Sequence, residues 1–263
     1  MRKYFTVYKN ALSSALQYRL NVGLTVVSHV VTLSGLVFLW FAIYRSGQAV
    51  GNYTLEAILM YYLVLTILRL VIANGVGMGF EISEEMRDGV IANYLLKPFS
   101  YTFERLMKAF GESTIIAFLI FPVVVVMIAL WGHLVELPNF VGWLQFLGMA
   151  FIGLIFYFLI YYLSALSSFW MTDGRSTIFA VLVVSGLFNG SMLPLDLFPD
   201  WFLAINTYSP FQYLMFLPIQ TFLGRVTDWS TVLLIGAAWM MIFSFLIWFV
   251  WRSGVKRFES VGR

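Results

Sequence analysis

The segment EEMRDGVIANYLLKPFS, residues 84–100, decides how the rest of this sequence is understood. It places acids, bases, a glycine and a proline in a short stretch between two long apolar runs. The whole chain of 263 residues is 61% hydrophobic and 11% charged, whereas soluble domains carry roughly 25% charged residues. A water-soluble protein of this length cannot bury so much apolar surface in one core. The composition therefore predicts an integral membrane protein with a polar, structured segment at its edge.

The apolar runs on both sides of this segment predict an all-α protein that crosses a membrane six times as a single domain, residues 1–263. A spanning helix needs about 20 mostly apolar residues. Continuous apolar runs, rather than alternating polar and apolar residues, favour helices over a β-barrel. The expected spans are about 21–44, 55–78, 109–131, 143–170, 176–194 and 231–252.

The distribution of basic residues predicts the orientation of these spans. Of the 16 Lys and Arg residues, 13 fall at the two ends of the chain, in residues 81–108 or in the turn at 171–175. The connections on the other side hold only Arg45 and Arg225, and Arg69 lies within a span. Because cytoplasmic loops carry the excess of Lys and Arg, both ends and the 84–100 segment are expected in the cytoplasm.

The first 16 residues have the pattern of an amphipathic helix that lies along the membrane surface. Apolar residues recur there at helical spacing, and polar residues largely fill the opposite face, which is typical of an interfacial helix. The alternative is that these residues begin the first span and extend it into the cytosol. The apolar positions are Met1, Tyr4, Phe5, Tyr8, Leu12, Ala15 and Leu16.

The 84–100 segment is expected to fold as helix, glycine, helix, proline, helix. The second span continues through charged residues without a proline, and Gly89 is a plausible helix stop. Residues 90–96 then predict a short helix that ends before Pro98, and Ser100 can cap the helix that leads into the third span.

This short helix has an apolar face beside an acidic shoulder. Val90, Ile91, Tyr94 and Leu95 share one face at helical spacing. An apolar face exposed to the cytosol indicates contact with lipid or with a partner. A merely solvated loop is the alternative interpretation.

The order of these features resembles the permease family of type-2 ABC transporters. A second span followed by acids, Arg-Asp-Gly, two leucines and Lys-Pro-Phe-Ser is similar to that family's first cytoplasmic loop, with its pattern E-x-R-x-G…LL-x-P-x-S. The stretch SGLFNGSMLPLDLFPDWFLAINTYSPFQYLMFLPIQTFLG, residues 185–224, resembles the family's region around the fifth span and its extracytoplasmic hairpin. The resemblance covers nearly the whole chain.

The resemblance implies that this chain is the membrane subunit of an ATP-driven exporter in a bacterial or archaeal cytoplasmic membrane. The family's loop is a coupling helix that docks on a separate ATPase subunit, and two ATPase subunits work with two permeases, identical or homologous. ATP and Mg²⁺ would be bound by the ATPase, and no nucleic acid is involved. The residues expected to contact the ATPase are Glu84, Glu85, Arg87, Asp88, Gly89, Tyr94, Leu95, Leu96, Lys97 and Pro98.

The sequence itself agrees with this division of labour. It contains no G-x-x-x-x-G-K-[ST] motif with which to cradle ATP phosphates. It also has no cysteine, and its two histidines, His29 and His133, are far apart. We therefore expect no catalytic, cofactor or metal site in this chain and no enzyme activity of its own.

Two alternative functions remain. A secondary transporter would show inverted repeats and charged residues near the middle of the membrane, and a lipid-modifying enzyme would need converging acid, base or metal-binding groups.

Arg69 is the one ionisable residue deep within an expected span, and such a residue is by default a functional candidate. It is expected either to line the transport path or to form a structural ion pair, with Glu112 near the start of the third span as the candidate partner. A side chain that reaches the membrane rim is a further alternative.

Residues 195–230 are too apolar for an ordinary loop, yet prolines cut them into pieces shorter than a span. We expect two short helices, 199–206 and 210–223, that form a re-entrant hairpin in the outer leaflet between the fifth and sixth spans. The hairpin is either a gate at the outward exit or a static lid. Its marker residues are Pro199, Trp201, Phe202, Pro210, Phe211, Phe216 and Pro218.

Overall fold

The structure is a computed structural model that describes residues 6–10, 19–47, 50–73, 75–95, 100–131, 137–171 and 173–257. Throughout these residues the chain is helical apart from turns and one isolated bridge between Val50 and Tyr53. The predicted all-α fold is therefore confirmed for the described part. Of the predicted surface helix, residues 6–10 are helical, and its other residues lie outside the described ranges.

The main helices follow the apolar runs, and short 3₁₀ helices (η) appear where prolines and polar residues interrupt them. Side chains cap two of the long helices: Thr54 accepts from the Ala57 amide at 3.2 Å, and Asn139 accepts from the Gly142 amide at 2.8 Å. In chain order the elements are α2 (Arg19–Arg45), α3 (Leu55–Ile72), α4 (Gly75–Arg87), α5 (Ile91–Leu95), α6 (Tyr101–Trp131), α7 (Phe140–Ala165), η2 (Leu166–Phe169), α8 (Arg175–Phe188), η3 (Leu195–Leu197), α9 (Asp200–Thr207), η4 (Pro210–Tyr213), α10 (Phe216–Phe222) and α11 (Trp229–Arg257).

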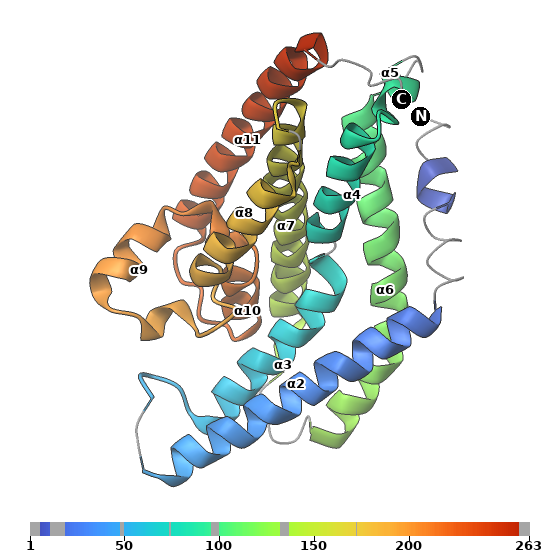
Figure 1. Cartoon of the computed structure of the whole chain (residues 1–263). Helices are drawn as coiled ribbons and strands as arrows, with labels where there is room; N and C mark the ends of the chain where they lie inside the picture. The colour runs from blue at the N-terminus through green and yellow to red at the C-terminus, as the bar shows by residue number, and fades with distance from the viewer. Residues whose placement is uncertain are drawn as a thin grey trace.

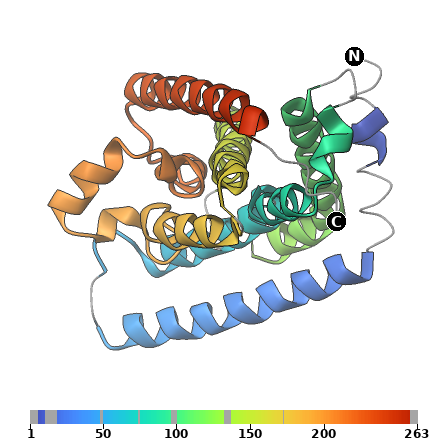
Figure 2. The same ribbon diagram turned by 45° about the horizontal axis from the view of Figure 1, so that its top comes forward.

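The core is built around α7, which lies in the middle of the helices in Figures 1 and 2. It contacts α3, α4, α8, α10 and α11, and the aromatic side chains Phe156, Tyr161 and Tyr162 are completely buried there. Helix α2 lies on the outside and packs against α3. The two ends of the molecule differ: α4 and α5 lie at one, and α2 meets the start of α3 at the other (Figure 1).

Among the residues that the structure describes, four helical stretches are long and apolar enough to cross a membrane: Val27–Arg45, Leu55–Arg87, Phe140–Phe169 and Trp229–Lys256. They agree with the first, second, fourth and sixth expected spans. The third expected span lies within α6, a helix of 31 residues. The fifth corresponds to α8, which is apolar but has 14 residues, fewer than the roughly 20 that a straight span requires.

One expected span is divided into two helices, and one expected span boundary is wrong. The span expected at 55–78 lies within the stretch Leu55–Arg87, in which α3 ends at Ile72 and α4 begins at Gly75. The span expected at 176–194 ends at Phe188, since the Asn189 side chain accepts a hydrogen bond from the Ser191 amide at 2.8 Å and Gly190 has a φ of +77°. This local turn competes with continuation of the helix.

Helix α4 packs unusually close to α7 through two glycines. A Cβ atom on Gly75 would lie 2.8 Å from the Tyr157 carbonyl oxygen, and one on Gly79 would lie 3.2 Å from that of Tyr161. A larger side chain at Gly75 would push the two backbones apart. Because Gly75 is the first residue of α4, this close approach places α4 against α7 from its N-terminal end.

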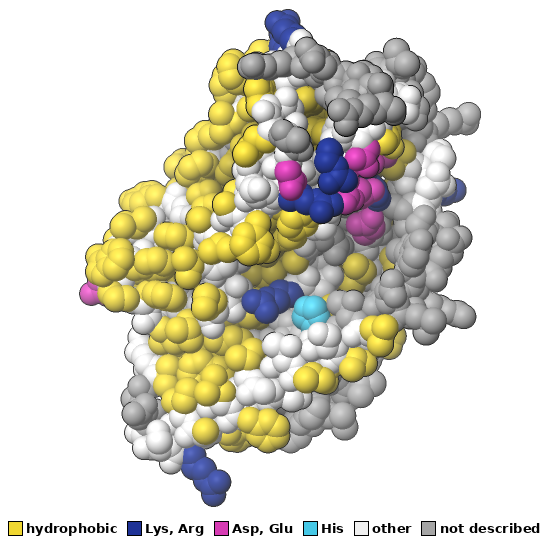
Figure 3. All heavy atoms as spheres, viewed as in Figure 1, with side chains coloured by type: hydrophobic (Ala, Val, Ile, Leu, Met, Phe, Trp, Pro, Cys, Tyr) yellow, Lys and Arg dark blue, Asp and Glu magenta, His cyan; other side chains and the backbone are white. Residues whose placement is uncertain are grey.

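The surface has an apolar flank and a separate group of charged side chains. Hydrophobic side chains cover much of the face in Figure 3, whereas acidic and basic side chains gather toward the end where α4 and α5 lie. Exposed large apolar residues occur along α2, α7, α8 and α11, as a membrane-embedded surface requires.

Candidate functional site

The candidate site is the region around α5, where the chain leaves α4 and enters α6. Helix α4 ends at Arg87, and Gly89 has a φ of +71°, the left-handed conformation that favours glycine at a helix end. Helix α5 follows, anchored by the completely buried side chain of Ile91. The Ser100 hydroxyl then accepts a hydrogen bond from the Phe103 amide at 3.4 Å, as expected of a cap, whereas the predicted end of the short helix before Pro98 lies outside the described residues.

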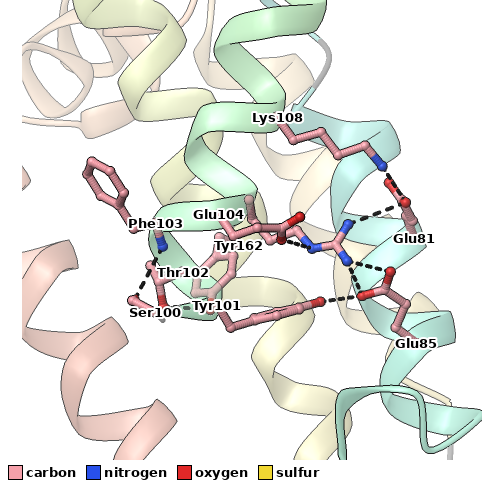
Figure 4. Close-up of polar contacts among 10 residues, drawn as sticks. Glu81, Glu85, Ser100, Tyr101, Thr102, Phe103, Glu104, Lys108 and Tyr162 are labelled. Atoms are coloured by element: carbon pink, nitrogen blue, oxygen red, sulfur yellow. Dashed lines mark hydrogen bonds and ion pairs between the residues drawn. The ribbon is translucent and has the colours of Figure 1, made fainter. Parts of the chain in front are cut away.

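The centre of this region is Arg105 of α6, whose side chain is only 2% exposed. Its guanidinium group forms ion pairs with Glu81 at 3.3 Å, with Glu104 at 3.2 Å and with Glu85. The Tyr101 hydroxyl donates a hydrogen bond to Glu85, and Lys108 pairs with Glu81 (Figure 4). We call Glu81, Glu85, Tyr101, Glu104, Arg105 and Lys108 the Arg105 network.

Aromatic rings extend the network to α5 and α11. The Arg105 guanidinium carbon lies 4.9 Å from the ring centroid of Tyr101 and 5.5 Å from that of Tyr94 on α5. Tyr94 meets Tyr101 edge-on at 5.1 Å, and Tyr101 stacks on Trp251 of α11 at 5.4 Å. These contacts join α5 to α6 and α11.

The network combines three carboxylates with two cations in a mostly buried setting. Burial raises the pKa of Glu104 above its usual value, and the neighbouring Arg105 only partly opposes this effect. Burial also raises the pKa of Tyr101, so its hydroxyl stays protonated and acts as a donor to Glu85. The arrangement fixes the position of α4 relative to α6.

The structure divides the residues expected to contact an ATPase. Glu85, one of these residues, is partly buried: its side chain is 16% exposed and faces Arg105. Tyr94 is half-buried against Tyr101. Leu96, Lys97 and Pro98, like the side chain of Leu95, lie outside the described residues.

The exposed described residues of the segment include three of the expected ATPase contacts, Glu84, Arg87 and Asp88. Arg87 and Asp88 form a surface ion pair at 3.1 Å, with side chains 46% and 57% exposed. Glu84 pairs with Arg175 across the turn before α8, again at the surface. Val90 is 39% exposed, and Asn93 of α5 is also exposed. Among the described residues of the segment, this surface is polar and charged around the apolar side chain of Val90.

A second polar cluster lies toward the opposite end, where α3 holds the turn that follows α8. Tyr61 donates to the Gly190 carbonyl at 2.7 Å, and Tyr62 donates to the Met192 carbonyl at 2.8 Å. Arg69 donates to the carbonyl of Ser191, between them, at 3.4 Å. We call residues 189–192 the α8 turn. Sequence reasoning missed these tyrosine contacts, because nothing near the tyrosines in sequence indicates a partner about 130 residues away.

This contact decides one question about Arg69. The expected ion pair with Glu112 is wrong, because the two described side chains do not pair and Arg69 instead reaches a backbone carbonyl. Glu112 lies on α6, on the same helix as Arg105 and Lys108. A backbone carbonyl can accept a hydrogen bond from an arginine within a membrane-spanning segment, so the arginine does not require an acidic partner.

The expected hairpin of 199–206 and 210–223 forms only in part. Helix α9 begins directly after Pro199, as expected, whereas the second helix divides into η4, which starts at Pro210, and α10, which starts at Phe216. Met215 separates the two pieces with φ −139° and ψ −49°, a non-helical conformation. The second expected helix is therefore wrong as one continuous element.

The hairpin residues also differ in their surroundings. Trp201 on α9 is 65% exposed, while Phe202 and Phe211 are half-buried and stack near Phe188. Phe216 and Pro218 are buried with the rest of α10, which packs against α7. Only α9 thus has a face that can meet the membrane.

Hydrogen bonds join α10 to the loop before α3. The Tyr53 hydroxyl donates to the Asp196 carboxylate at 2.9 Å and accepts from the Gln220 side chain at 2.7 Å. The Arg225 guanidinium carbon lies 4.1 Å from the centroid of the Tyr53 ring. The hairpin is therefore attached to α3 both through this cluster and through the α8 turn.

The apolar helices, the interrupted second span and the short helix at its polar end define a multi-pass α-helical membrane protein of the transporter type. Residues 30–262 match the family model described as ABC-2 family transporter protein, so the chain belongs to that family. It is a membrane permease of an ABC transporter, as the 84–100 segment predicted. Permeases of this family generally work with ATP-binding subunits. No curated protein matches the sequence.

Proposed function

We propose that this permease forms the membrane path of an ATP-driven exporter and is moved by a separate ATPase subunit that docks on α5 and the exposed residues beside it. The observation that carries the proposal is the Arg105 network. A partner that pushes on α5 acts through Tyr94 and Tyr101 on a nearly fully buried arginine. The segment is built as a lever rather than as a flexible loop.

In this proposal motion of α5 reaches the rest of the molecule by two routes. The first passes from α5 to α6 and α11 through the stacked rings of Tyr101 and Trp251. The second passes along α4, which is fixed to α7 at Gly75 and Gly79. In this proposal the ATPase binds ATP and Mg²⁺ and hydrolyses the ATP. The permease forms the walls of the transport path, and these walls move.

The complete transporter in this proposal contains two ATPase subunits and two permeases, the second being a further copy of this chain or a homologue. It resides in a bacterial or archaeal cytoplasmic membrane, with α5 and both ends of the chain in the cytoplasm. The 13-to-2 division of basic residues supports this orientation.

Orientation is tested with single cysteines, because the chain has no native cysteine. Ser46, exposed in the loop after α2, and Asn93, exposed on α5, lie on opposite sides in the proposed topology. In intact cells a membrane-impermeant maleimide should label Ser46→Cys and leave Asn93→Cys unlabelled until the cells are opened. Labelling of Asn93→Cys alone in intact cells would reverse the proposed topology.

Docking is tested by placing a charge on the exposed apolar residue of the segment. Val90→Asp should abolish co-purification of the ATPase and its stimulated ATP turnover, while the amount of permease in the membrane stays unchanged. Thr227→Asp, in the exposed loop before α11, is the control and should retain the ATPase. If Val90→Asp retains a fully stimulated ATPase, the dock lies elsewhere.

A further inference from the structure

An apolar cavity lies between α3, α6, α7 and α10, in the half of the molecule away from α5. Its volume is about 250 Å³, and every residue that lines it is hydrophobic. Helix α10 closes one side with Phe222, which packs edge-on against Trp143 and Phe146 of α7. The cavity is therefore a feature of the packed core, bounded by four elements.

The residues that line the cavity extend along the helix axes. Its lining on α3 runs from Met60 to Ile72, twelve positions that correspond to roughly 18 Å of helix. Its lining on α7 runs from Trp143 to Ala150, roughly 10 Å. A cavity extended along the helix axes fits an extended chain better than a compact ligand.

Water is a poor occupant of this cavity. An ordered buried water needs two to four polar partners, and apolar cavities of about 150 Å³ stay dry and take up apolar molecules. An empty cavity leaves its lining without dispersion contacts on one side. An alkyl chain restores those contacts and needs no hydrogen bond.

The cavity also opens where alkyl chains are available. Ala117 and Phe121 of α6 and Leu147 of α7 line it and are exposed, the last two by 64% and 59%. These residues belong to the apolar flank that the bilayer covers, so the entrance faces lipid. We propose that the cavity holds one acyl chain of a membrane phospholipid, inserted from the bilayer beside α6 and α7.

The probe is a phosphatidylglycerol that carries a photoactivatable diazirine midway along one acyl chain. Native membrane vesicles that contain the full chain are loaded with the probe and irradiated, and the labelled peptides are identified by mass spectrometry. The expected result is strong labelling of residues that line the cavity, above that of Phe245, an exposed residue of α11 that reports ordinary contact with the bilayer.

Three matched substitutions separate the cavity from the general surface. Ala150→Phe fills the cavity and Ala117→Phe blocks its mouth, so each should reduce labelling of the cavity residues several-fold. Ala237→Phe, exposed on α11 and outside the cavity, should leave the labelling unchanged. Labelling at Phe245 should stay constant in all three and thereby show that the folded protein is still embedded.

Because Ala117 is exposed, its variant is expected to fold even if Ala150→Phe does not. Cavity labelling no stronger than that of Phe245 would overturn the proposal. So would cavity labelling that survives Ala117→Phe in a protein that retains normal labelling at Phe245.

Discussion

At the α5 end of the molecule, charged side chains join α4 to α6, whereas toward the opposite end tyrosine hydroxyls join α3 to the α8 turn. The two regions belong to the two halves of the same interrupted span. In the Arg105 network both partners are charged, so the loss of one leaves another charge partly buried. At the α8 turn two neutral tyrosine hydroxyls and the Arg69 guanidinium group donate to backbone carbonyls, and each bond can be lost without leaving a partner charge buried.

This difference suggests different roles for the two halves. An ion network around one arginine is cooperative, which suits a lever that must move as a unit. Single hydrogen bonds to a turn are weaker, typically about 0.5–1.5 kcal/mol net each, which suits a region that exchanges between positions. The break between Ile72 and Gly75 separates the two types of attachment.

The largest expected effect follows from Arg105→Leu. The substitution leaves Glu81, Glu85 and Glu104 without their shared cation and should lower the free energy of unfolding by about 3–5 kcal/mol. Unfolding of the purified permease in SDS, followed by tryptophan fluorescence, measures the change. A loss below 1 kcal/mol would mean that the network does not hold α4 to α6.

Tyr61→Phe tests the opposite end and should have a smaller effect. Tyr61 is completely buried, and without its hydroxyl the Gly190 carbonyl loses its donor, at a cost of about 1–3 kcal/mol. Tyr208→Phe, at a tyrosine that is 68% exposed, is the control and should change stability by less than about 0.5 kcal/mol. If Tyr61→Phe costs as much as Arg105→Leu in the same SDS assay, the contrast between the two regions fails.

The pH dependence of Glu104 gives a third and smaller effect. Because burial raises the pKa of Glu104, its contribution to stability is fully present below the unfolded pKa of about 4.3 and is lost as pH rises through the higher folded pKa. The stability of the native protein relative to Glu104→Gln should therefore fall as pH rises above about 4.3. A relative stability that rises over this range would show that pairing with Arg105 outweighs burial.

The smallest effect is expected for Arg87→Ala. Arg87 and Asp88 form an exposed ion pair, and such pairs contribute less than about 1 kcal/mol. The SDS unfolding curve should be nearly that of the native protein, and that result would show that the cost of Arg105→Leu reflects burial rather than charge alone. A loss as large as that for Arg105→Leu would remove this distinction.

Several local features of the α5 region could be predicted from the sequence. Gly89 follows the end of one helix and Ser100 caps the start of another, which are common positions for glycine and serine. The helix end and the cap therefore follow from residue type. The inward position of Glu85 was missed, although a signal existed. Glu81 and Glu85 are four residues apart on one helix face, and Arg105 and Lys108 are three apart on the next helix, which is the spacing of two complementary faces.

The opposite end could be predicted less well, because its contacts depend on tertiary structure. The side chain of Tyr53 meets Asp196 and Gln220, which are more than 140 positions away, and no local pattern indicates this. The division of the second hairpin helix at Met215 has one local signal, Pro218 in the first turn of α10, which cannot donate a hydrogen bond to the Leu214 carbonyl. There the Phe216 amide bonds to the Asn189 carbonyl at 3.0 Å, so the α8 turn interrupts the helix from outside.

The central claim is that α5 is the surface on which an ATPase subunit acts, and accessibility of Asn93 tests it most directly. Asn93→Cys, the only cysteine in the chain, is treated with maleimide in inside-out vesicles that contain either the permease alone or the complete transporter. We predict rapid labelling of the permease alone and strong protection in the complex, while a cysteine at Lys256, exposed near the end of α11, reacts equally in both. Equal labelling of Asn93→Cys with and without a bound, active ATPase would contradict the account.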